Sequence, residues 1–516
     1  MSPLERFAGW LGEWLGAHWR AYLVVVSVLC LLTFSGYSHA KVPWIDEVLE
    51  LTIARLAGPP QIWDALRAGI QVDPPALHIS IHYLFRMFGE HVYLARLPAI
   101  LGFGLMCLCA AALVRRHAPP LYAAAAFFLP YGTGLRWRAM DARPYGAMAG
   151  FCALALLCWD GMAGERHRTM WRVGFILSLA ATFSTHFFSI VILLPLALGE
   201  LFKWIKRKRL DWGSLASIAV ALVPYMFWSP LLLASRHLMK HYFFQVSFTN
   251  LYEFFGSSIA SMPLAGVLLL LFAAVALAGR LRVDETPWSA PTERQQILLA
   301  LCAGFFLVPF AGYAAGVLVT GFFVPYNLVL TVFGLIIGLP LVTALITGRS
   351  QLVGLCVFLA IFGHGLFVTA RGLSGYVRRD AIYPPLASVT KLIPDPNADI
   401  VISSTAHFLP FQEANRQDPD SRRLVYLFDV SKPLEEKGPD VADVVYSQLR
   451  GLTPARIEPF DSYLASHKRL YIAVMGETKG LQEWQVQYLR EHVPARWTWR
   501  GRVGDFDIYQ VDLGTG

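Results

Sequence analysis

Residues 21–34 read AYLVVVSVLCLLTF, an apolar run without a charged side chain. A helix needs roughly 20 such residues to cross a bilayer, and apolar runs recur along most of the chain. We expect about eleven transmembrane spans, several of them shorter than that length. They are predicted near residues 20–37, 92–114, 119–135, 144–160, 171–184, 186–203, 212–233, 263–281, 296–320, 323–346 and 350–371. The sequence therefore predicts an α-helical polytopic membrane protein.

The composition agrees with a membrane environment for the larger part of the chain. Of the 516 residues, 55% are hydrophobic and 16% are charged, and the mean hydropathy is +0.47. A soluble domain carries about 25% charged residues, so a purely soluble enzyme is excluded. Residues 376–516 hold 17 Lys and Arg and 19 Asp and Glu, whereas the first 375 residues hold only 27 and 17. This contrast predicts a membrane body followed by a water-soluble domain.

The positions of the basic residues give an orientation. With the N-terminus in the cytoplasm, the cytoplasmic turns fall at residues 115–117, 165–172, 203–209, 280–294 and at Arg349, and most are rich in Lys and Arg. Cytoplasmic loops carry such an excess. An odd number of spans then puts the C-terminal domain outside the cytoplasm, so we predict a multi-pass protein of the cytoplasmic (inner) membrane. The same clusters account for the net charge of +8 without a nucleic-acid partner.

We divide the chain into three parts. Residues 1–19 form an amphipathic segment, residues 20–375 form the membrane body with long outer loops at 38–91 and 234–263, and residues 376–516 form a soluble domain. Strand-like runs (400–404, 424–428, 469–474, 507–511) alternate with helix-like ones (441–449, 480–492) in the last part, which predicts an extracytoplasmic α/β domain. Neither a GxGxxG motif nor a P-loop occurs, and the cysteines form no metal or disulfide pattern, so no nucleotide or redox cofactor is expected.

The first outer loop carries two groups of candidate functional residues. Asp46 and Glu47 come directly after the first span. This carboxylate pair can supply a general base, or it can cap the following helix, where acidic side chains favour the helix dipole. Asp73 precedes two prolines, and His78 and His82 follow at helical i, i+4 spacing. The two histidines can form a metal-binding face, or their spacing can arise by chance.

A further candidate group lies on the outer side between the third and fourth spans, where residues 136–145 read RWRAMDARPY. The positive-inside rule places arginines mainly in cytoplasmic loops, so membrane orientation does not explain three arginines in an outer loop. They therefore need another explanation. The guanidinium groups of Arg136, Arg138 and Arg143 suit bidentate contacts with phosphate, and Asp141 adds a carboxylate. The alternative is a self-neutralising ion-pair cluster at the headgroup boundary. His186, in a tight outer turn before residue 187, is a weaker candidate.

Taken in order, these motifs resemble those of a known family. The acidic pair, DPPALH (73–78), FGEHVYLARLPAILG (88–102), RAMDARPYGAM (138–148) and FSTHFF (183–188) are similar to motifs of the GT-C glycosyltransferases of the protein O-mannosyltransferase and lipid A aminoarabinose transferase type. The resemblance covers residues 44–190 motif by motif and the remainder by architecture. It implies an enzyme that takes a sugar from a polyprenyl-phosphate carrier and transfers it to an acceptor outside the cytoplasm.

The resemblance also assigns residues. Asp46, with Glu47 beside it, matches the acidic position of the first loop. Asp141, Arg143 and Tyr145 match an E-x-R-x-Y motif, with Asp in place of Glu. The other matches are Asp73, Pro74 and Pro75 in the PP loop, Arg96, Leu97 and Pro98 in a structural motif, and Thr185 and His186 in an outer turn.

The chain departs from the family pattern before the late span. Relatives often carry Arg-Tyr there, whereas this chain reads VPYN at residues 324–327. If the missing arginine contacts the carrier phosphate, another cation must replace it, and Arg236, Lys240, Arg136 or Arg138 could do so. The substrate-binding residues that we expect are Asp73, Arg136, Arg138, Arg143, Tyr145, His186, Arg236, Lys240 and Tyr326.

The implied reaction needs two kinds of group. The departing lipid phosphate carries negative charge that cations or a metal must stabilise, and the acceptor hydroxyl needs a carboxylate to take its proton. We predict Asp46 as this base, with Glu47 and Asp141 as further catalytic candidates, in a single displacement that inverts the anomeric carbon. A divalent cation shared by His78, Asp141 and His186 stays an open option, because no spacing demands it.

Two other classes of function compete with this prediction. A transporter or flippase of the lipid-linked substrate would place ionisable residues in mid-span and often shows inverted repeats. Here the candidate charges gather at the outer surface, and the sequence shows no repeat. A scaffold for envelope assembly explains the soluble domain but leaves the RWRAMDARPY loop without a purpose. The predicted partners are therefore a polyprenyl-phosphate sugar, an extracytoplasmic acceptor (lipid, polysaccharide or protein) and membrane lipids.

Overall fold

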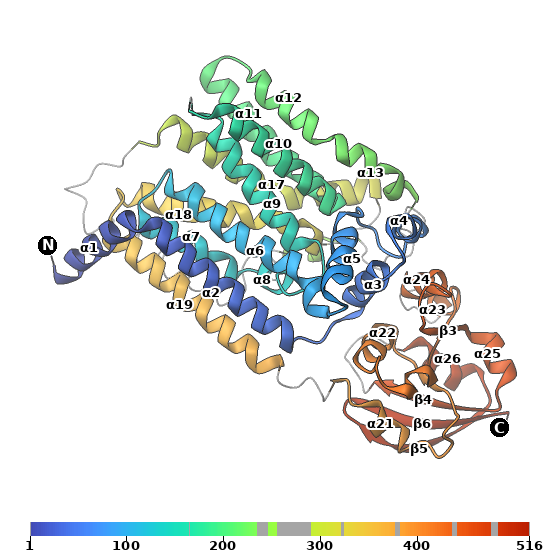
Figure 1. Cartoon of the computed structure of the whole chain (residues 1–516). Coiled ribbons are helices and arrows are strands. Elements are labelled where there is room, and N and C mark those ends of the chain that lie inside the picture. The colour runs from blue at the N-terminus through green and yellow to red at the C-terminus, as the bar shows by residue number, and fades with distance from the viewer. Residues whose placement is uncertain are drawn as a thin grey trace. The chain divides into compact units, whose positions relative to one another are not determined.

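The computed structural model describes residues 2–164, 166–234, 246–254, 290–320, 323, 325–376, 382–435, 441–475 and 483–514 (Figure 1). The chain forms two compact units. Unit 1 comprises Met1–His39, Tyr93–Ser229 and Phe244–Ser374, and unit 2 comprises Ala40–Val92, Pro230–Phe243 and Gly375–Gly516.

Unit 1 is helical in its described residues. Its helices are α1 (Pro3–Ala17), α2 (Trp19–Ala40), α6 (Val92–Arg115), α7 (Pro120–Phe128), α8 (Leu135–Arg138), α9 (Tyr145–Gly161), α10 (Arg168–Thr185), α11 (Leu193–Arg207), α12 (Trp212–Ala221), α13 (Val223–Ala234), α15 (Phe248–Phe254), α17 (Glu293–Ala315), α18 (Val332–Ile346) and α19 (Gln351–Tyr376). Short 3-10 segments η1 (Leu129–Gly132), η2 (Phe187–Ile192) and η5 (Pro325–Thr331) and a π-helical turn η4 (Gly316–Thr320) complete it.

Seven helices among the described residues are long and apolar enough to cross a membrane. They are Trp19–Ala40, Val92–Arg115, Phe187–Arg207, Trp212–Ala234, Glu293–Leu318, Leu328–Ile346 and Gln351–Gly372. The predicted polytopic helical class is therefore confirmed, whereas the count of about eleven spans is not. The reason is length: α7 has 9 residues and α9 has 17, which correspond to about 14 and 25 Å against a hydrocarbon core of about 30 Å. The span expected at 263–281 lies outside the described residues.

Helices α6 and α9 touch through their backbones. A Cβ atom on Gly146 would lie 2.4 Å from the carbonyl oxygen of Ala99, and one on Gly150 would lie 2.4 Å from that of Gly102. Small residues four apart on a helix allow this close an approach between membrane helices. Because α9 begins at Tyr145, the contact fixes the RWRAMDARPY loop at the N-terminal end of α9.

The start of α6 is also tied to the end of α2. Arg96, of which only 1% is exposed, donates from Nη1 to the carbonyl oxygen of Ser38 at 2.6 Å. One turn earlier on α2, the rings of Phe34 and Phe103 pack with centroids 4.6 Å apart. Arg96 therefore occupies a structural position, as expected for the Arg-Leu-Pro motif.

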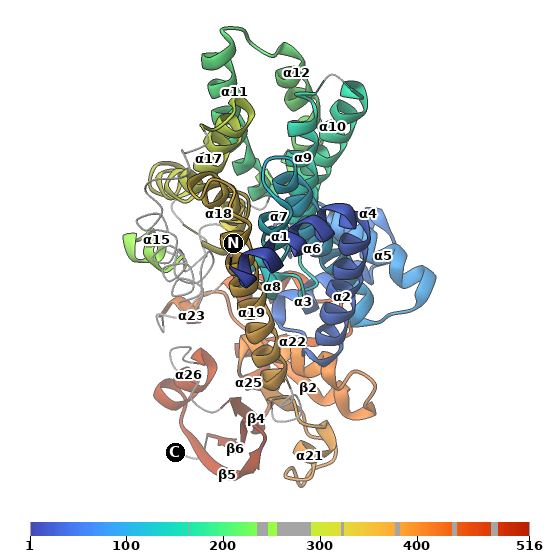
Figure 2. The ribbon, with the colours of Figure 1, turned by 90° about the vertical axis from the view of Figure 1, so that its left-hand side faces the viewer.

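Helix α1 is amphipathic. Its buried residues Ala8 and Leu15 pack against Leu121 at the start of α7 and Leu355 near the start of α19, and both views show α1 beside α7 (Figures 1 and 2). On the other face Trp10 is 57% exposed. Apolar and aromatic side chains exposed along one face are typical of a helix that lies in the membrane interface.

Unit 2 combines helices from the first outer loop with a mixed sheet. Its helices are α3 (Ile45–Ala54), α4 (Pro59–Ala68), α5 (Ala76–Phe88), α21 (Leu386–Thr390), α22 (Thr405–Ala414), α23 (Lys432–Glu435), α24 (Val441–Leu449), α25 (Phe460–Ser466) and α26 (Trp484–His492), with the 3-10 turn η6 (Pro419–Arg423). Its strands are β1 (Ile400–Ile402), β2 (Leu424–Phe428), β3 (Arg456–Pro459), β4 (Arg469–Met475), β5 (Ala495–Val503) and β6 (Phe506–Leu513).

The sheet has the order β3-β2-β1-β4-β6-β5. The strands from β3 to β4 are parallel, and β6 pairs antiparallel with both β4 and β5. Val401, Val425, Ile472 and Val511 form its core with Trp484 of α26. The predicted α/β character and the four predicted strands are present. The sequence missed β3 and β5, which are edge strands whose charged residues and glycine weaken a strand pattern.

The helices of the first outer loop pack with the C-terminal part of the chain, although the sequence assigned them to the membrane body. Arg55 donates from Nη1 and Nη2 to both carboxylate oxygens of Glu413 on α22, at 2.8 and 2.6 Å. Glu90 accepts from Arg416 at 2.8 Å and lies 3.2 Å from Nε of Arg55. Partial burial raises the pKa of Glu90, but the two guanidinium groups outweigh it and hold this pKa below its usual value.

The α6–α9 contact predicts opposite effects for two glycine substitutions. Gly150→Ala should lower the free energy of unfolding by about 1–3 kcal/mol, because the new methyl group overpacks a backbone contact. Gly363→Ala on α19 is the matched control, since a Cβ atom there meets nothing within 4 Å. It should raise the free energy of unfolding by up to about 1 kcal/mol through better helix propensity. Thermal unfolding of both variants in one detergent measures the difference, and a Gly150→Ala variant as stable as Gly363→Ala would refute the close contact.

Candidate active site

The two carboxylates of the first loop have different surroundings. Both lie in the first turn of α3. Glu47 has no exposed surface, and its Oε2 accepts from Nζ of Lys41 at 2.8 Å and from the backbone N–H of Trp44 at 3.4 Å. It therefore closes the N-terminal turn of the helix. Asp46 is half-buried, so it is the carboxylate of this pair that a ligand can reach.

The loop that carries Asp73 lies beside this turn. Gln71 donates from Nε2 to the carbonyl oxygen of Asp46 at 3.4 Å. Asp73 is 2% exposed, and Pro75 then precedes the first residue of α5. Proline at this point limits the backbone and sets where the helix begins. Asp46 and Asp73, two residues singled out from the sequence, thus lie in adjacent segments of unit 2.

A buried acid–histidine pair joins α3 to α5. Oε2 of Glu50 lies 2.5 Å from Nε2 of His78, and neither side chain has exposed surface. His82, one turn further along α5, contacts the carbonyl oxygen of Ala54 through Nδ1 at 2.9 Å. Both histidines therefore face α3, which accounts for their spacing. The sequence analysis missed Glu50, although its position four residues after Asp46 is a signal that could have found it.

The arginine–aspartate cluster, which we define as Arg138, Asp141, Arg143, Tyr145 and His186, assembles in unit 1. Nη1 of Arg138 lies 3.2 Å from Oδ2 of Asp141. The guanidinium carbons of Arg138 and Arg143 lie 5.1 and 5.8 Å from the ring centroid of Tyr145, and the ring of His186 lies 5.2 Å from the same ring. These distances suit cation–π and aromatic contacts. The structure thus brings together five residues that the sequence had placed in two separate motifs.

Most of this cluster is withdrawn from water. Asp141 is 4% exposed and Arg143 is 7% exposed. Between α10 and η2, Nδ1 of His186 accepts a hydrogen bond from the backbone N–H of Phe188 at 3.0 Å, which leaves Nε2 as the protonated nitrogen of the neutral ring. Charges in such an environment interact more strongly than they would in water. The cluster can therefore bind an anionic group and orient it.

The remaining predicted substrate-binding residues have other positions. The guanidinium carbon of Arg136 lies 4.6 Å from the ring centroid of Trp137, and Arg136 is half-buried. The backbone of Tyr326 lies in η5, and its side chain falls outside the part of the chain that the structure describes. Arg236 and Lys240 also lie outside the described residues.

The residues proposed for a metal ion, His78, Asp141 and His186, come from both units. His78 contacts Glu50 in unit 2, and Asp141 and His186 belong to the cluster in unit 1. Within the residues that the structure describes, no three His, Cys, Asp or Glu side chains are arranged to hold a metal ion. A bound divalent cation stays a prediction.

These features define a class of protein, a polytopic helical membrane body followed by an α/β domain, with charged clusters at helix ends. Two crystal structures share this fold. ArnT from Cupriavidus metallidurans bound to undecaprenyl phosphate matches with a TM-score of 0.56, 14% sequence identity, 95% of this chain and 98% of the ArnT chain. The apo state of the same ArnT matches with a TM-score of 0.57, 14% identity, 96% of this chain and 98% of the ArnT chain. The chain has an ArnT-like fold, as the sequence resemblance implied. No protein-family model and no curated protein sequence matches the chain.

The surroundings of Asp46 and Glu47 predict different effects on stability. Glu47→Gln should lower the free energy of unfolding by about 1–3 kcal/mol, because it weakens the helix cap and leaves the mostly buried Lys41 without its charged partner. Asp46→Asn should change it by less than about 0.5 kcal/mol, since Asp46 is half-buried and lies on the accessible side of the turn. Thermal unfolding of the two variants side by side measures this. Equal losses would contradict the structural role of Glu47.

Proposed function

We propose that the protein is a membrane glycosyltransferase that transfers a sugar from a polyprenyl-phosphate donor to an acceptor on the outer face of the cytoplasmic membrane. The observation that carries the proposal is the buried arginine–aspartate cluster, which joins two guanidinium groups, a carboxylate and a histidine at one end of a membrane body. The fold supports it, because an ArnT structure of the same fold holds undecaprenyl phosphate.

The arginines suit the departing group of this reaction. When the bond between the anomeric carbon and the phosphate oxygen breaks, the lipid phosphate leaves with additional negative charge. Arg138 and Arg143 can offer planar N–H pairs to two phosphate oxygens, and Asp141 holds Arg138 in position. Tyr145 lies beneath both guanidinium groups, which limits the orientations that they can adopt.

The proton of the acceptor needs a separate group. We assign this role to Asp46, whose carboxylate is half-buried at the start of α3. In one displacement the acceptor oxygen attacks the anomeric carbon, the phosphate leaves with the electron pair, and Asp46 takes the hydroxyl proton. This inverts the anomeric carbon without a covalent enzyme intermediate. Glu47 is buried against Lys41 and acts through the fold of the turn.

Other residues support binding in this proposal. Asp73, Arg136, His186, Tyr326, Arg236 and Lys240 are assigned to contacts with donor or acceptor. The buried Glu50–His78 pair holds α3 and α5 together, and with them Asp46. The C-terminal domain and the candidate residues would face the outside of the cell, as the distribution of Lys and Arg predicts.

A reconstituted reaction tests the proposal against the flippase alternative. Purified full-length protein in proteoliposomes should release polyprenyl phosphate from a polyprenyl-phosphate sugar only when an acceptor hydroxyl compound is added. Free phosphate carrier and glycosylated acceptor, both quantified by mass spectrometry, should appear in equal amounts. The protein would be a flippase instead if intact donor moved between the leaflets without cleavage and this movement explained all loss of donor from its original leaflet.

Two substitutions separate the assigned roles. Asp46→Asn keeps the shape of the side chain but cannot take a proton, so the single-turnover rate should fall by roughly 10²–10⁴-fold with donor affinity unchanged. Arg143→Lys keeps the charge but loses the planar fork, so it should mainly weaken donor binding. Measuring donor affinity and single-turnover rate for both variants distinguishes a loss of proton transfer from a loss of donor binding. Full activity of Asp46→Asn would end its assignment as the base, whatever Arg143→Lys does.

A further inference from the structure

A cavity of about 620 Å³ lies in unit 1 at the opposite end of α9 from the arginine–aspartate cluster. Helix α9 begins at Tyr145, in the cluster, and ends at Gly161, in the wall of the cavity. Its 17 residues separate the two places by about 25 Å. The cavity is therefore a second site, which the proposed glycosyl transfer does not use.

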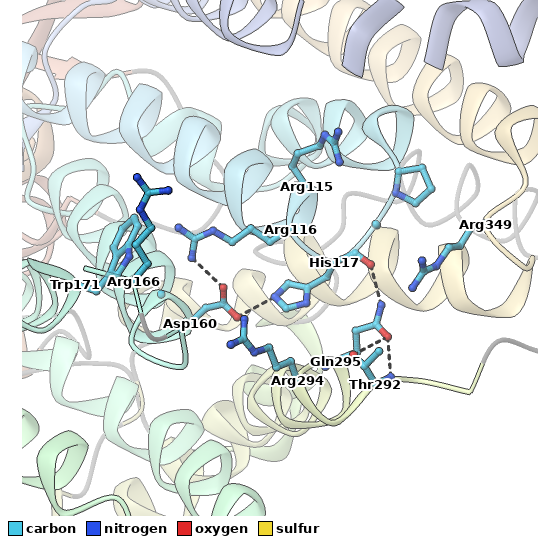
Figure 3. A pocket seen from close by; sticks show the side chains of 14 residues that line it. Arg115, Arg116, His117, Asp160, Arg166, Trp171, Thr292, Arg294, Gln295 and Arg349 are labelled. Atoms are coloured by element: carbon cyan, nitrogen blue, oxygen red, sulfur yellow. Dashed lines mark hydrogen bonds and ion pairs between the residues drawn. The ribbon is translucent and has the colours of Figure 1, made fainter. Parts of the chain in front are cut away.

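Five arginines line this cavity, and they lie at or next to helix ends in four separate parts of the chain (Figure 3). Within the described part of the chain, Asp160 is the single carboxylate among the lining residues. The arginines are Arg115 at the end of α6, Arg116 directly after it, Arg166 before α10, Arg294 at the start of α17 and Arg349 between α18 and α19. The wall thus carries a large excess of positive charge.

The one carboxylate is already neutralised. Asp160 lies 2.9 Å from Nη1 of Arg116 and 2.8 Å from Nε2 of His117, and the dashed lines in Figure 3 mark these contacts. Among the described residues, no carboxylate lies within ion-pair distance of Arg166, Arg294 or Arg349, and all three side chains are exposed. The neighbouring Glu293 pairs instead with Arg207, at 2.6 Å. Arg294 donates from Nη2 to the carbonyl oxygen of Ala163 at 2.7 Å. Accessible guanidinium groups that have no acidic partner among the described residues suit a phosphate ligand.

The depth of the cavity relative to the membrane follows from its aromatic neighbours. The guanidinium carbon of Arg115 lies 6.0 Å from the ring of Trp19, and that of Arg116 lies 4.7 Å from the ring of Trp171. Helix α1, with Trp10 and Trp14 exposed, packs against α7 and α19 at this same end of unit 1. Tryptophans gather at the level of the lipid headgroups. The arginines therefore lie where phospholipid phosphates lie.

The helix that leaves the cavity also suits acyl chains. Around and beyond Trp171, α10 exposes Met170, Val173 and Leu177, of which 59%, 50% and 64% are accessible. They recur at intervals of three and four residues, so they form one apolar stripe along the helix. A soluble phosphate ester has no acyl chains that could pack against this stripe. The acyl chains of a lipid bound at the cavity would cover it.

We propose that this cavity binds the phosphodiester headgroup of an anionic phospholipid, with Arg294 and Arg349 as principal contacts. Basic pockets between membrane helices recognise anionic headgroups in this way. The inference does not rest on the proposed glycosyl transfer, because the cavity uses none of the residues of the candidate active site. A free phosphate or phosphate ester shares the same chemistry, and the experiment distinguishes the two sources.

The test is lipid binding to the purified full-length protein. Native mass spectrometry in detergent should show tighter binding of phosphatidylglycerol than of phosphatidylcholine. Arg294→Gln combined with Arg349→Gln should weaken phosphatidylglycerol binding by about 25-fold, or five-fold for each arginine, and leave phosphatidylcholine binding unchanged. The matched control is Lys206→Gln combined with Arg209→Gln, which removes two exposed charges near the end of α11, outside the cavity lining. It should weaken phosphatidylglycerol binding by less than about two-fold.

Four outcomes would count against the proposal. Equal affinity of the unaltered protein for the two lipids, or equal losses in the two double variants, would show that no specific site exists. Displacement of phosphatidylglycerol by millimolar inorganic phosphate would assign the cavity to a soluble anion. If the Arg294/Arg349 variant has a lower melting temperature, Arg166→Gln replaces it, because Arg166 is exposed and donates from Nε to Nε2 of its neighbour His167. Unchanged lipid binding in that variant would count against the site.

Discussion

The backbone contact between α6 and α9 is the constraint on which the geometry of unit 1 depends. Glycines at 102, 146 and 150 let the two helices approach until the carbonyl oxygens of one face the Cα atoms of the other. This contact fixes Tyr145 at one end of α9. At the other end it brings Asp160 to the two residues that follow α6, Arg116 and His117. The arginine–aspartate cluster and the arginine-lined cavity thus take their positions from the same pair of helices.

The apolar surroundings explain why the charges gather at these two ends. A charged side chain within the hydrocarbon region is costly unless it is paired. Glu200 on α11 shows how such a group is accommodated, because its Oε1 accepts from Trp159 at 2.6 Å, from Lys203 at 2.7 Å and from Ser214 at 2.6 Å. All three donors are side chains of this chain, which leaves Glu200 little capacity for a ligand. Among the described residues, the exposed Arg294 and Arg349 of the cavity have no carboxylate partner, although Arg294 donates to the carbonyl oxygen of Ala163 at 2.7 Å. This difference separates a structural charge from a candidate binding site.

The sequence predicted the fold class and part of the candidate site for identifiable reasons. Apolar runs are continuous in the sequence, so they predict membrane helices without knowledge of the fold. Asp141, Arg143 and Tyr145 lie within five residues of one another, so their motif could also be recognised in the sequence. The contact of His186 with Tyr145 joins residues 41 positions apart in two separate motifs, so the sequence did not predict it. Glu50 was missed because its partner His78 belongs to another helix and its direct neighbours Leu49 and Leu51 are apolar, although its spacing of four residues from Asp46 was a usable signal. The count of about eleven spans is not confirmed, because helices such as α7 are too short to cross the bilayer by themselves.

The acidic pair on α3 shows why residue type alone does not identify a catalytic base. Successive residues on a helix point about 100° apart, so Asp46 and Glu47 cannot face the same surroundings. Glu47 and Glu50 are three residues apart and share the buried side of the helix, where Lys41 and His78 meet them. Two of the three carboxylates on this helix are therefore occupied in holding the structure together. The half-buried Asp46 differs from them in access, and a base needs access in order to reach the hydroxyl group of an acceptor.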